Sequence, residues 1–187
     1  MVYYTAKFRN SFPNVKAMNT YIDLVFLEAN QGYENSNVPI IIVVHCKELI
    51  SIRDYESLTS RDALANFGID VGTKSVDTAS LWTETFDMVS STACASGYVD
   101  VARDCRWAYS VVNKGCALLG YGFAHELGHN LGSRHNIEQY VNVDDHSISY
   151  AHGFLIAEDP SVPNRVPGQP SIGWLPHHHG LSEIIPF

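Results

Sequence analysis

The sequence is poor in cationic residues and lacks a long apolar run. It has 12 Lys and Arg against 20 Asp and Glu, which gives a formal net charge of −8 at pH 7. The cationic residues do not cluster, so the chain lacks the basic surface that nucleic-acid phosphates or an anionic membrane would bind. The longest apolar run, residues 38–45, is much shorter than the roughly 18 residues that a membrane-spanning helix needs. We therefore expect no nucleic-acid partner and no membrane span.

Two short motifs are also missing. The chain has no Gly-x-Ser-x-Gly, the turn that carries the nucleophile of many serine hydrolases. It has no Cys-x-x-Cys pair either, which argues against a thioredoxin-type site or a cysteine-rich zinc site. The four cysteines are isolated, at Cys46, Cys94, Cys105 and Cys116.

An even number of cysteines suggests two disulfides, and three connectivities are possible. Four free thiols in a cytosolic protein are the alternative, because the chain carries no export signal. The length and composition are those of one globular domain: 187 residues, 45% of them hydrophobic and 17% charged.

One stretch combines three histidines, a glutamate and a glycine at fixed spacing, His125-Glu126-x-x-His129-x-x-Gly132-x-x-His135. Two residues four apart on a helix differ by about 400° and about 6 Å, so the first two imidazoles leave the same face. A continuous helix would carry the third histidine about 15 Å along the axis from the first. The chain must therefore turn back, and Gly132 can take the left-handed conformation that ends a helix.

This pattern predicts a zinc site. Three neutral imidazoles, from His125, His129 and His135, leave one position of tetrahedral Zn²⁺ open to water, as in catalytic sites. Glu126 is next to the first ligand and is placed to accept a proton from that water.

The motif, with Phe123-Ala124 before it and Asn130-Leu131 within it, resembles the zinc signature of the metzincin metallopeptidases, and most closely their reprolysin (adamalysin) branch. The resemblance implies a secreted zinc endopeptidase that acts on peptides or proteins, with one Zn²⁺ per chain and an apolar residue after the cleaved bond. It also implies an α+β (α/β-like) fold. In that fold a twisted mixed sheet of four to five strands, with an antiparallel edge strand, packs on two long helices, one of which carries the zinc motif.

Two further features follow from the resemblance. The edge strand that binds substrate corresponds to Ser96, Gly97 and Tyr98, and the expected disulfide joins Cys94 to Cys116. An edge strand offers unpaired backbone groups to an extended peptide.

Patterning elsewhere predicts the remaining elements. Pro13 is expected in the first turn of a helix whose apolar residues recur every three or four positions, namely Met18, Tyr21, Ile22, Val25, Phe26 and Ala29. Residues 1–5, 38–45 and 107–113 are expected as strands, residues 60–67 and 76–85 as helices, and residues 30–37 as a turn-rich link.

The chain departs from the metzincin pattern at both ends. Metzincins have a methionine in a turn after the third histidine, whereas Met1, Met18 and Met88 all precede the motif. We therefore expect a catalytic domain over residues 1–166, with its first strand and C-terminal subdomain incomplete, and an irregular proline-rich tail over residues 167–187. The chain is expected to begin inside the first strand, so that Met1 is not the start of the precursor. A non-catalytic zinc protein that binds peptides, or a truncated protease product without function, are the alternatives.

Overall fold

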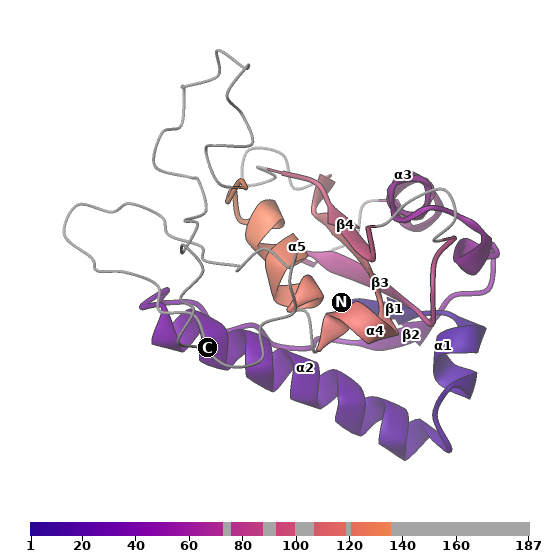
Figure 1. The fold of residues 1–187 in the computed structure, drawn as a ribbon, viewed down its shortest axis with the longest axis horizontal. Coiled ribbons are helices and arrows are strands. Elements are labelled where there is room, and N and C mark those ends of the chain that lie inside the picture. The colour runs from indigo at the N-terminus through magenta and orange to yellow at the C-terminus, as the bar shows by residue number, and fades with distance from the viewer. Residues whose placement is uncertain (73–75, 88–92, 100–106, 119–120, 136–187) are drawn as a thin grey trace, which may run out of the picture.

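The computed structural model describes residues 1–72, 76–87, 93–99, 107–118 and 121–135. These residues form a five-stranded sheet with helices against both of its faces (Figure 1). The segment after the third histidine, where metzincins have their Met-turn, and the predicted tail at residues 167–187 lie outside the described residues.

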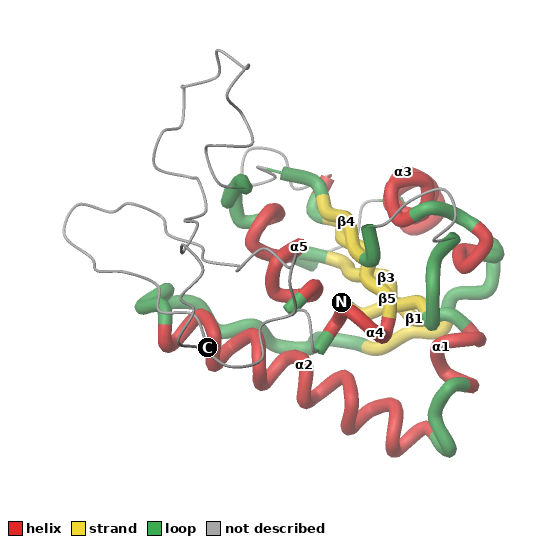
Figure 2. The backbone as a smooth tube through the Cα atoms, viewed as in Figure 1, coloured by secondary structure: helices red, strands yellow, loops and turns green. Residues whose placement is uncertain are grey.

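The sheet has the order β2-β1-β3-β5-β4, and its strands lie side by side in Figure 2. The parallel strands are β1 (Val2–Tyr4), β2 (Lys47–Leu49), β3 (Ala79–Thr83) and β5 (Tyr109–Asn113). At one edge β4 (Ala95–Gly97) pairs with β5 in the antiparallel direction. A mixed sheet with an antiparallel edge strand was predicted, and the structure contains one.

Alternate residues of the central strands face opposite layers, because side chains leave a strand with a period of two. Val2, Trp82 and Val112 belong to the core beneath α2 and α5, whereas Tyr3, Leu81 and Val111 belong to the core beneath α3. The sheet is therefore covered on both faces, as parallel sheets require.

The helices are α1 (Ala6–Asn10), α2 (Val15–Asn35), α3 (Ser60–Val71), α4 (Lys114–Ala117) and α5 (Gly122–Asn130), with a 3₁₀ turn at Tyr55–Ser57. Only α2, with 21 residues, is long. The helix that carries the histidine motif has 9 residues, so the expectation of two long helices is wrong for the described chain. No described helix is both long and apolar enough to cross a membrane.

Helix α2 differs from the prediction at both ends. It begins at Val15, because the Asn14 side chain accepts a hydrogen bond from the Ala17 amide at 2.9 Å and caps the helix. It then continues through the expected link at residues 30–37 as far as Asn35. The reason is tertiary: Tyr33 is buried, and its hydroxyl donates to the Ala124 carbonyl at 2.9 Å.

Two other segments were assigned wrongly from the sequence. Residues 76–85 were expected as a helix but contain β3, which is buried along its whole length and so shows no alternation of polar and apolar residues. Residues 38–45 were expected as a buried strand. They are outside the strands, with Ile41 and Val43 84% and 75% exposed.

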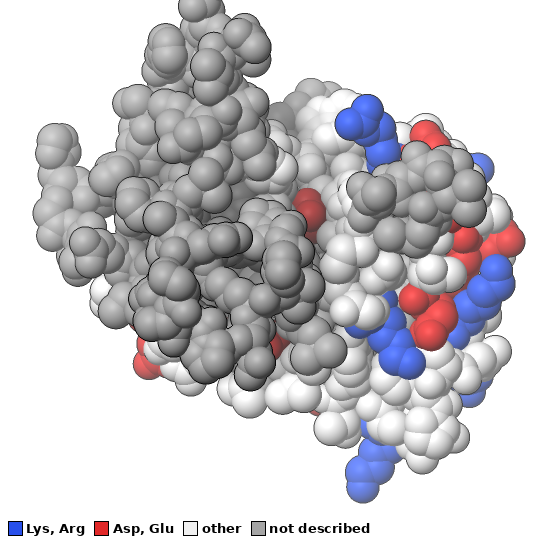
Figure 3. Space-filling view, viewed as in Figure 1, with Lys and Arg blue, Asp and Glu red and all other residues white. Residues whose placement is uncertain are grey.

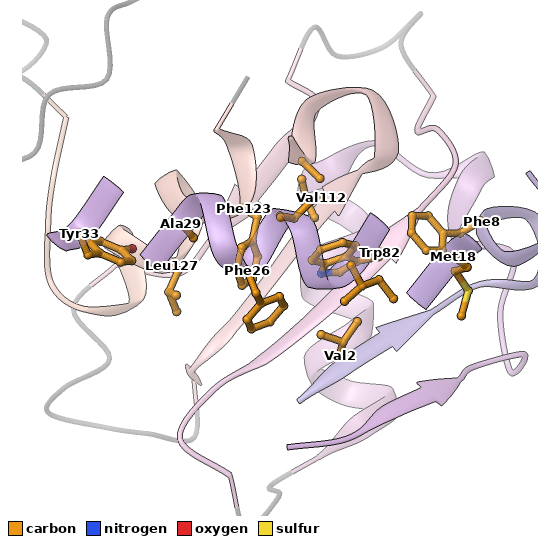
Figure 4. Close-up of a cluster of buried hydrophobic side chains, with 13 residues drawn as sticks. Val2, Phe8, Met18, Phe26, Ala29, Tyr33, Trp82, Val112, Phe123 and Leu127 are labelled. Atoms are coloured by element: carbon orange, nitrogen blue, oxygen red, sulfur yellow. The ribbon is translucent and has the colours of Figure 1, made fainter. Parts of the chain in front are cut away.

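The core beneath α2 surrounds Trp82 of β3 (Figure 4). The ring of Phe123 on α5 lies 4.6 Å from that of Phe26 on α2 and 5.4 Å from that of Trp82. Leu127, one helical turn after Phe123, is also buried in this cluster. Helix α5 is thus fixed on its apolar face against both the sheet and α2.

A disulfide joins Cys94, just before β4, to Cys116 of α4, with their Cα atoms 6.0 Å apart. This is the pair that the family resemblance implied. Cys46 is a free, exposed thiol, and Cys105 lies outside the described residues, so the described chain contains no second disulfide.

Charged side chains of both signs are interspersed over the described surface seen in Figure 3. Several pair with each other, among them Lys7 with Asp54 and Lys47 with Asp23. This face of the described chain therefore carries no extended patch of one sign.

Candidate metal centre

The three histidines of the motif come from α5 and from the turn that follows it. His125 and His129 are four residues apart on α5 and leave the face opposite Phe123 and Leu127. Because the apolar face is packed in the core, the two imidazoles are held on a rigid support.

A glycine turn then reverses the chain. Gly132 has φ +97°, its amide donates to the His129 carbonyl at 2.9 Å, and the Ser133 amide donates to the Gly128 carbonyl at 2.9 Å. These two bonds form a Schellman motif, which ends a helix with one residue in a left-handed conformation. The turn brings His135 back beside the first two histidines.

The three rings converge on one point. The Nε2 atom of His135 lies 3.2 Å from Nε2 of His125 and 3.1 Å from Nε2 of His129. Two nitrogens bound at 2.0–2.1 Å to a tetrahedral Zn²⁺ would lie about 3.4 Å apart. The three residues also form a group whose ligand atoms are all within 4.8 Å of one another. The donor set and its spacing therefore fit a single small cation.

The protonation of the histidines suits metal binding. Burial, followed by the charges of His129 and His135, lowers the pKa of His125 to about 3. Burial is also the main cause that lowers the pKa of His129 to about 4. Both imidazoles are thus neutral at pH 7, and the neutral ring is the form that binds a metal.

A backbone contact orients one ring further. His129 Nδ1 lies 2.8 Å from the Ser133 carbonyl. A carbonyl can only accept, so Nδ1 carries the proton and the lone pair of Nε2 faces the other two histidines.

Glu126 lies on the side of α5 that meets the edge strand. It is 7% exposed, and burial raises the pKa of its carboxyl to about 8. A buried carboxyl of raised pKa, on the residue next to a candidate metal ligand, has the character of a catalytic acid or base.

The three edge-strand residues predicted to bind substrate have different surroundings in the structure. Gly97 lies directly against Glu126. Ser96 faces the other way, and its hydroxyl donates to the hydroxyl of Ser60 on α3 at 3.0 Å. Tyr98 places its ring against Trp107, with centroids 5.2 Å apart, so its side chain also has a structural contact.

Sequence reasoning missed Asn130. Its amide nitrogen donates to the Tyr98 carbonyl at 2.8 Å and the Tyr109 carbonyl at 3.1 Å, and its oxygen accepts from the Thr78 hydroxyl at 3.0 Å. Asn130 is 3% exposed. The only sequence signal for this role is a polar residue next to the second histidine, in a helix that is otherwise packed in the core.

Comparison with known proteins identifies the family of this chain. The model of a reprolysin family, described as metallopeptidase family M12, matches residues 1–161. The chain belongs to this family. Metallopeptidases of family M12 bind a metal ion, and in this chain the His125, His129 and His135 group has the composition to hold one.

Curated relatives have the name peptidyl-Asp metalloendopeptidase. One from Stenotrophomonas maltophilia (strain R551-3) is 29% identical over 154 residues, which is 79% of this chain and 35% of the relative. One from Xanthomonas campestris pv. campestris is 30% identical over 143 residues, 73% of this chain and 33% of the relative. The chain thus spans about a third of the length of these relatives.

A solved structure described as a chaperone-substrate complex also resembles this fold. The TM-score is 0.61 at 16% identity, over 83% of this chain and 28% of the other. At this identity the similarity concerns the fold alone.

Proposed function

We propose that this chain carries the catalytic centre of a zinc endopeptidase, with His125, His129 and His135 as ligands and Glu126 as general base. The observation that carries the proposal is the convergence of three Nε2 atoms, with that of His135 3.2 and 3.1 Å from the other two, and a buried carboxyl on the residue next to His125. Family M12 membership supports the metal and the reaction class. The catalytic unit is proposed to cover residues 1–166, with residues 167–187 as its irregular tail.

A zinc ion held by the three imidazoles would polarise both a water molecule and the carbonyl of the scissile peptide. Glu126 accepts a proton from the water as its oxygen attacks the carbonyl carbon. The protonated carboxyl then donates this proton to the amide nitrogen, and the carbon–nitrogen bond breaks. Burial by itself raises the pKa of the Glu126 carboxyl to about 8. A cation held by the three imidazoles would lower this pKa and keep the carboxylate ionised, which is the form that accepts the proton.

The edge strand supports the binding of an extended peptide. The Tyr98 amide donates to the Tyr109 carbonyl and the Asn113 amide donates to the Cys94 carbonyl, so the residues that flank β4 bond to this neighbouring chain, and Ser96, midway between them, is the register partner of Val111. In an antiparallel ladder the residues between them direct their amides and carbonyls outward. Ala95 and Gly97 therefore offer the backbone groups to which a substrate strand would add.

The relatives' names suggest a peptidyl-aspartate bond as the substrate, in place of the apolar residue after the cut that the sequence resemblance implied. We propose cleavage at aspartate. Peptides that differ only in Asp, Asn or Leu at the scissile bond would be cleaved fastest with Asp, whereas a preference for Leu would contradict this. The disulfide between Cys94 and Cys116 supports a secreted location.

The deciding experiment compares the parent chain with Glu126→Ala. We expect both proteins to contain one zinc per chain. The rate of casein hydrolysis should be lower in Glu126→Ala than in the parent by a factor of at least about 10³. A chelator should remove the parent's activity and added Zn²⁺ should restore it. Zinc bound by a parent that hydrolyses nothing would instead favour a non-catalytic zinc protein that binds peptides at β4.

A further inference from the structure

Gly97 of β4 is in unusually close contact with Glu126. A methyl group added at Gly97 would lie 2.9 Å from the Glu126 carbonyl oxygen, 3.0 Å from its Oε2 atom and 3.2 Å from its Cβ atom. Real Cβ atoms do not approach a backbone oxygen this closely. The absence of a side chain at position 97 is therefore what allows the backbone of β4 to lie against the glutamate.

The strand is fixed in this position from both ends. The amide of Asn130 on α5 holds the carbonyl of Tyr98, the residue after Gly97, at 2.8 Å. At the other end the disulfide from Cys94 anchors the chain just before β4 to α4. β4 is also paired with β5 along its length. Because the strand and α5 are both fixed, the atom that can move most easily away from a larger residue at position 97 is Oε2, at the end of the flexible Glu126 side chain.

Gly122 of α5 is similarly tight, since a methyl group there would lie 2.9 Å from the Cys116 carbonyl oxygen, but it does not meet Glu126, and two other glycines lack such a contact. A methyl group at Gly115 of α4 would meet only the Asn113 side chain, at an ordinary contact distance of 3.6 Å. Gly72 has open space around it and is required for its positive φ of 60°. At position 97, in contrast, glycine is required because a side chain would not fit.

We propose that Gly97 is a positioning residue for the Glu126 carboxylate: the bare backbone at Gly97 forms the wall that fixes this side chain beside the three histidines. This inference rests on the proposed function of Glu126. It assigns to Gly97 a role in the chemical step, in addition to the backbone groups that β4 offers to a substrate.

The first test is Gly97→Ala, with Gly115→Ala as the matched control. We expect Gly97→Ala to keep one zinc per chain and a KM close to that of the parent, and to lower kcat about 10- to 100-fold through displacement of the base. Gly115→Ala should retain the kcat of the parent. A raised KM with unchanged kcat would place Gly97 in substrate binding and overturn the proposal, as would unchanged values of both.

A second test does not depend on activity. Gly97→Ala is expected to lower the Tm of the parent, and to lower it less in a Glu126→Ala background, where the Oε2 atom that meets the new methyl group is absent. Gly115→Ala should change Tm equally in both backgrounds. An equal effect of Gly97→Ala in both backgrounds would show that the two side chains do not compete for the same space.

The two tests separate the possible failures. An inactive parent with a background-dependent Tm effect would refute the proposed function and retain the contact. An active parent whose Gly97→Ala variant keeps its kcat would refute the positioning role alone.

Discussion

At the scale of single residues, the site depends on contacts that are absent from the zinc motif itself. Asn130 joins α5 to two neighbouring segments of the sheet, because it donates to the carbonyl of Tyr98, which follows β4, and to that of Tyr109, the first residue of β5. Its neighbour His129 belongs to the group of three histidines. One buried side chain therefore sets the distance between the helix that carries the imidazoles and the strand that carries Gly97.

We predict that Asn130→Ala destabilises the protein by about 1–3 kcal/mol. The Tyr98 carbonyl loses the Asn130 donor, and the Tyr109 carbonyl keeps only the Tyr98 amide. Urea unfolding of the metal-free protein measures this directly. The control is Asn66→Ala, which removes a half-buried side chain whose exposed hydrogen bond to the Asp62 carbonyl lies within α3 and should cost less than about 0.5 kcal/mol. Equal effects of the two substitutions would contradict the role of Asn130.

At the scale of elements, α3 shows how a helix on the far face of the sheet is attached. Asp70, in its last turn, accepts from Arg53 Nε at 2.7 Å and from Arg53 Nη2 at 3.0 Å. It also accepts from the Tyr55 hydroxyl at 2.7 Å. The hydrogen bonds from Arg53, followed by that from Tyr55, lower the pKa of Asp70 below its usual value. The segment before α3 is thus fixed to the end of the helix.

This attachment predicts a dependence of stability on pH. The native pKa of Asp70 is lower than its unfolded value, which is about 3.9. The contribution of Asp70 is therefore complete above about pH 5 and is lost as the pH falls through the native pKa. Asp70→Asn should lower the Tm at pH 7, and the difference from the parent should shrink in more acidic solution.

Asp54→Asn is the matched control, because Asp54 pairs with Lys7 at 3.0 Å while both side chains are 59% exposed. Such a pair contributes little to stability. Asp70→Asn should therefore lower the Tm at neutral pH more than Asp54→Asn does. If the parent and Asp70→Asn differ by the same amount at pH 7 and pH 2.5, the charge of Asp70 is not the cause.

At the scale of the whole molecule, the proposed metal site has ligands both on α5 and on the chain that follows the turn at Gly132. His125 and His129 belong to α5, whereas His135 follows the turn at Gly132. A cation bound to all three would hold the returning chain against the helix. A ligand that binds only the folded state stabilises it by mass action.

We therefore predict that removal of metal lowers the Tm and that Zn²⁺ restores it. At a free Zn²⁺ concentration about 100 times the Kd, the stabilisation is about 2.7 kcal/mol. Calorimetry of the chelated protein with and without Zn²⁺ measures it, and His135→Ala should abolish most of the response. A His135→Ala variant that responds to Zn²⁺ as the parent does would remove His135 from the ligand set.

Much of the candidate site could be predicted because its geometry is local. The spacing of His125 and His129 determines a shared helix face, and Gly132 permits the reversal that brings His135 back. The apolar face of α2 could likewise be read from the repeat of Met18, Ile22 and Val25, which are all buried. These features depend on helical periodicity and on the freedom of glycine at positive φ, both of which act within a few residues.

Other features were decided by the tertiary structure. Residues 76–85 resemble a helix in isolation, and they form the central strand because β1 and β5 pair with them on both sides. The close contact of Gly97 with Glu126, and the bonds of Asn130 to Tyr98 and Tyr109, join residues from about 20 to 30 positions apart. No local pattern marks such pairs, because strand order and helix docking alone determine which distant residues meet.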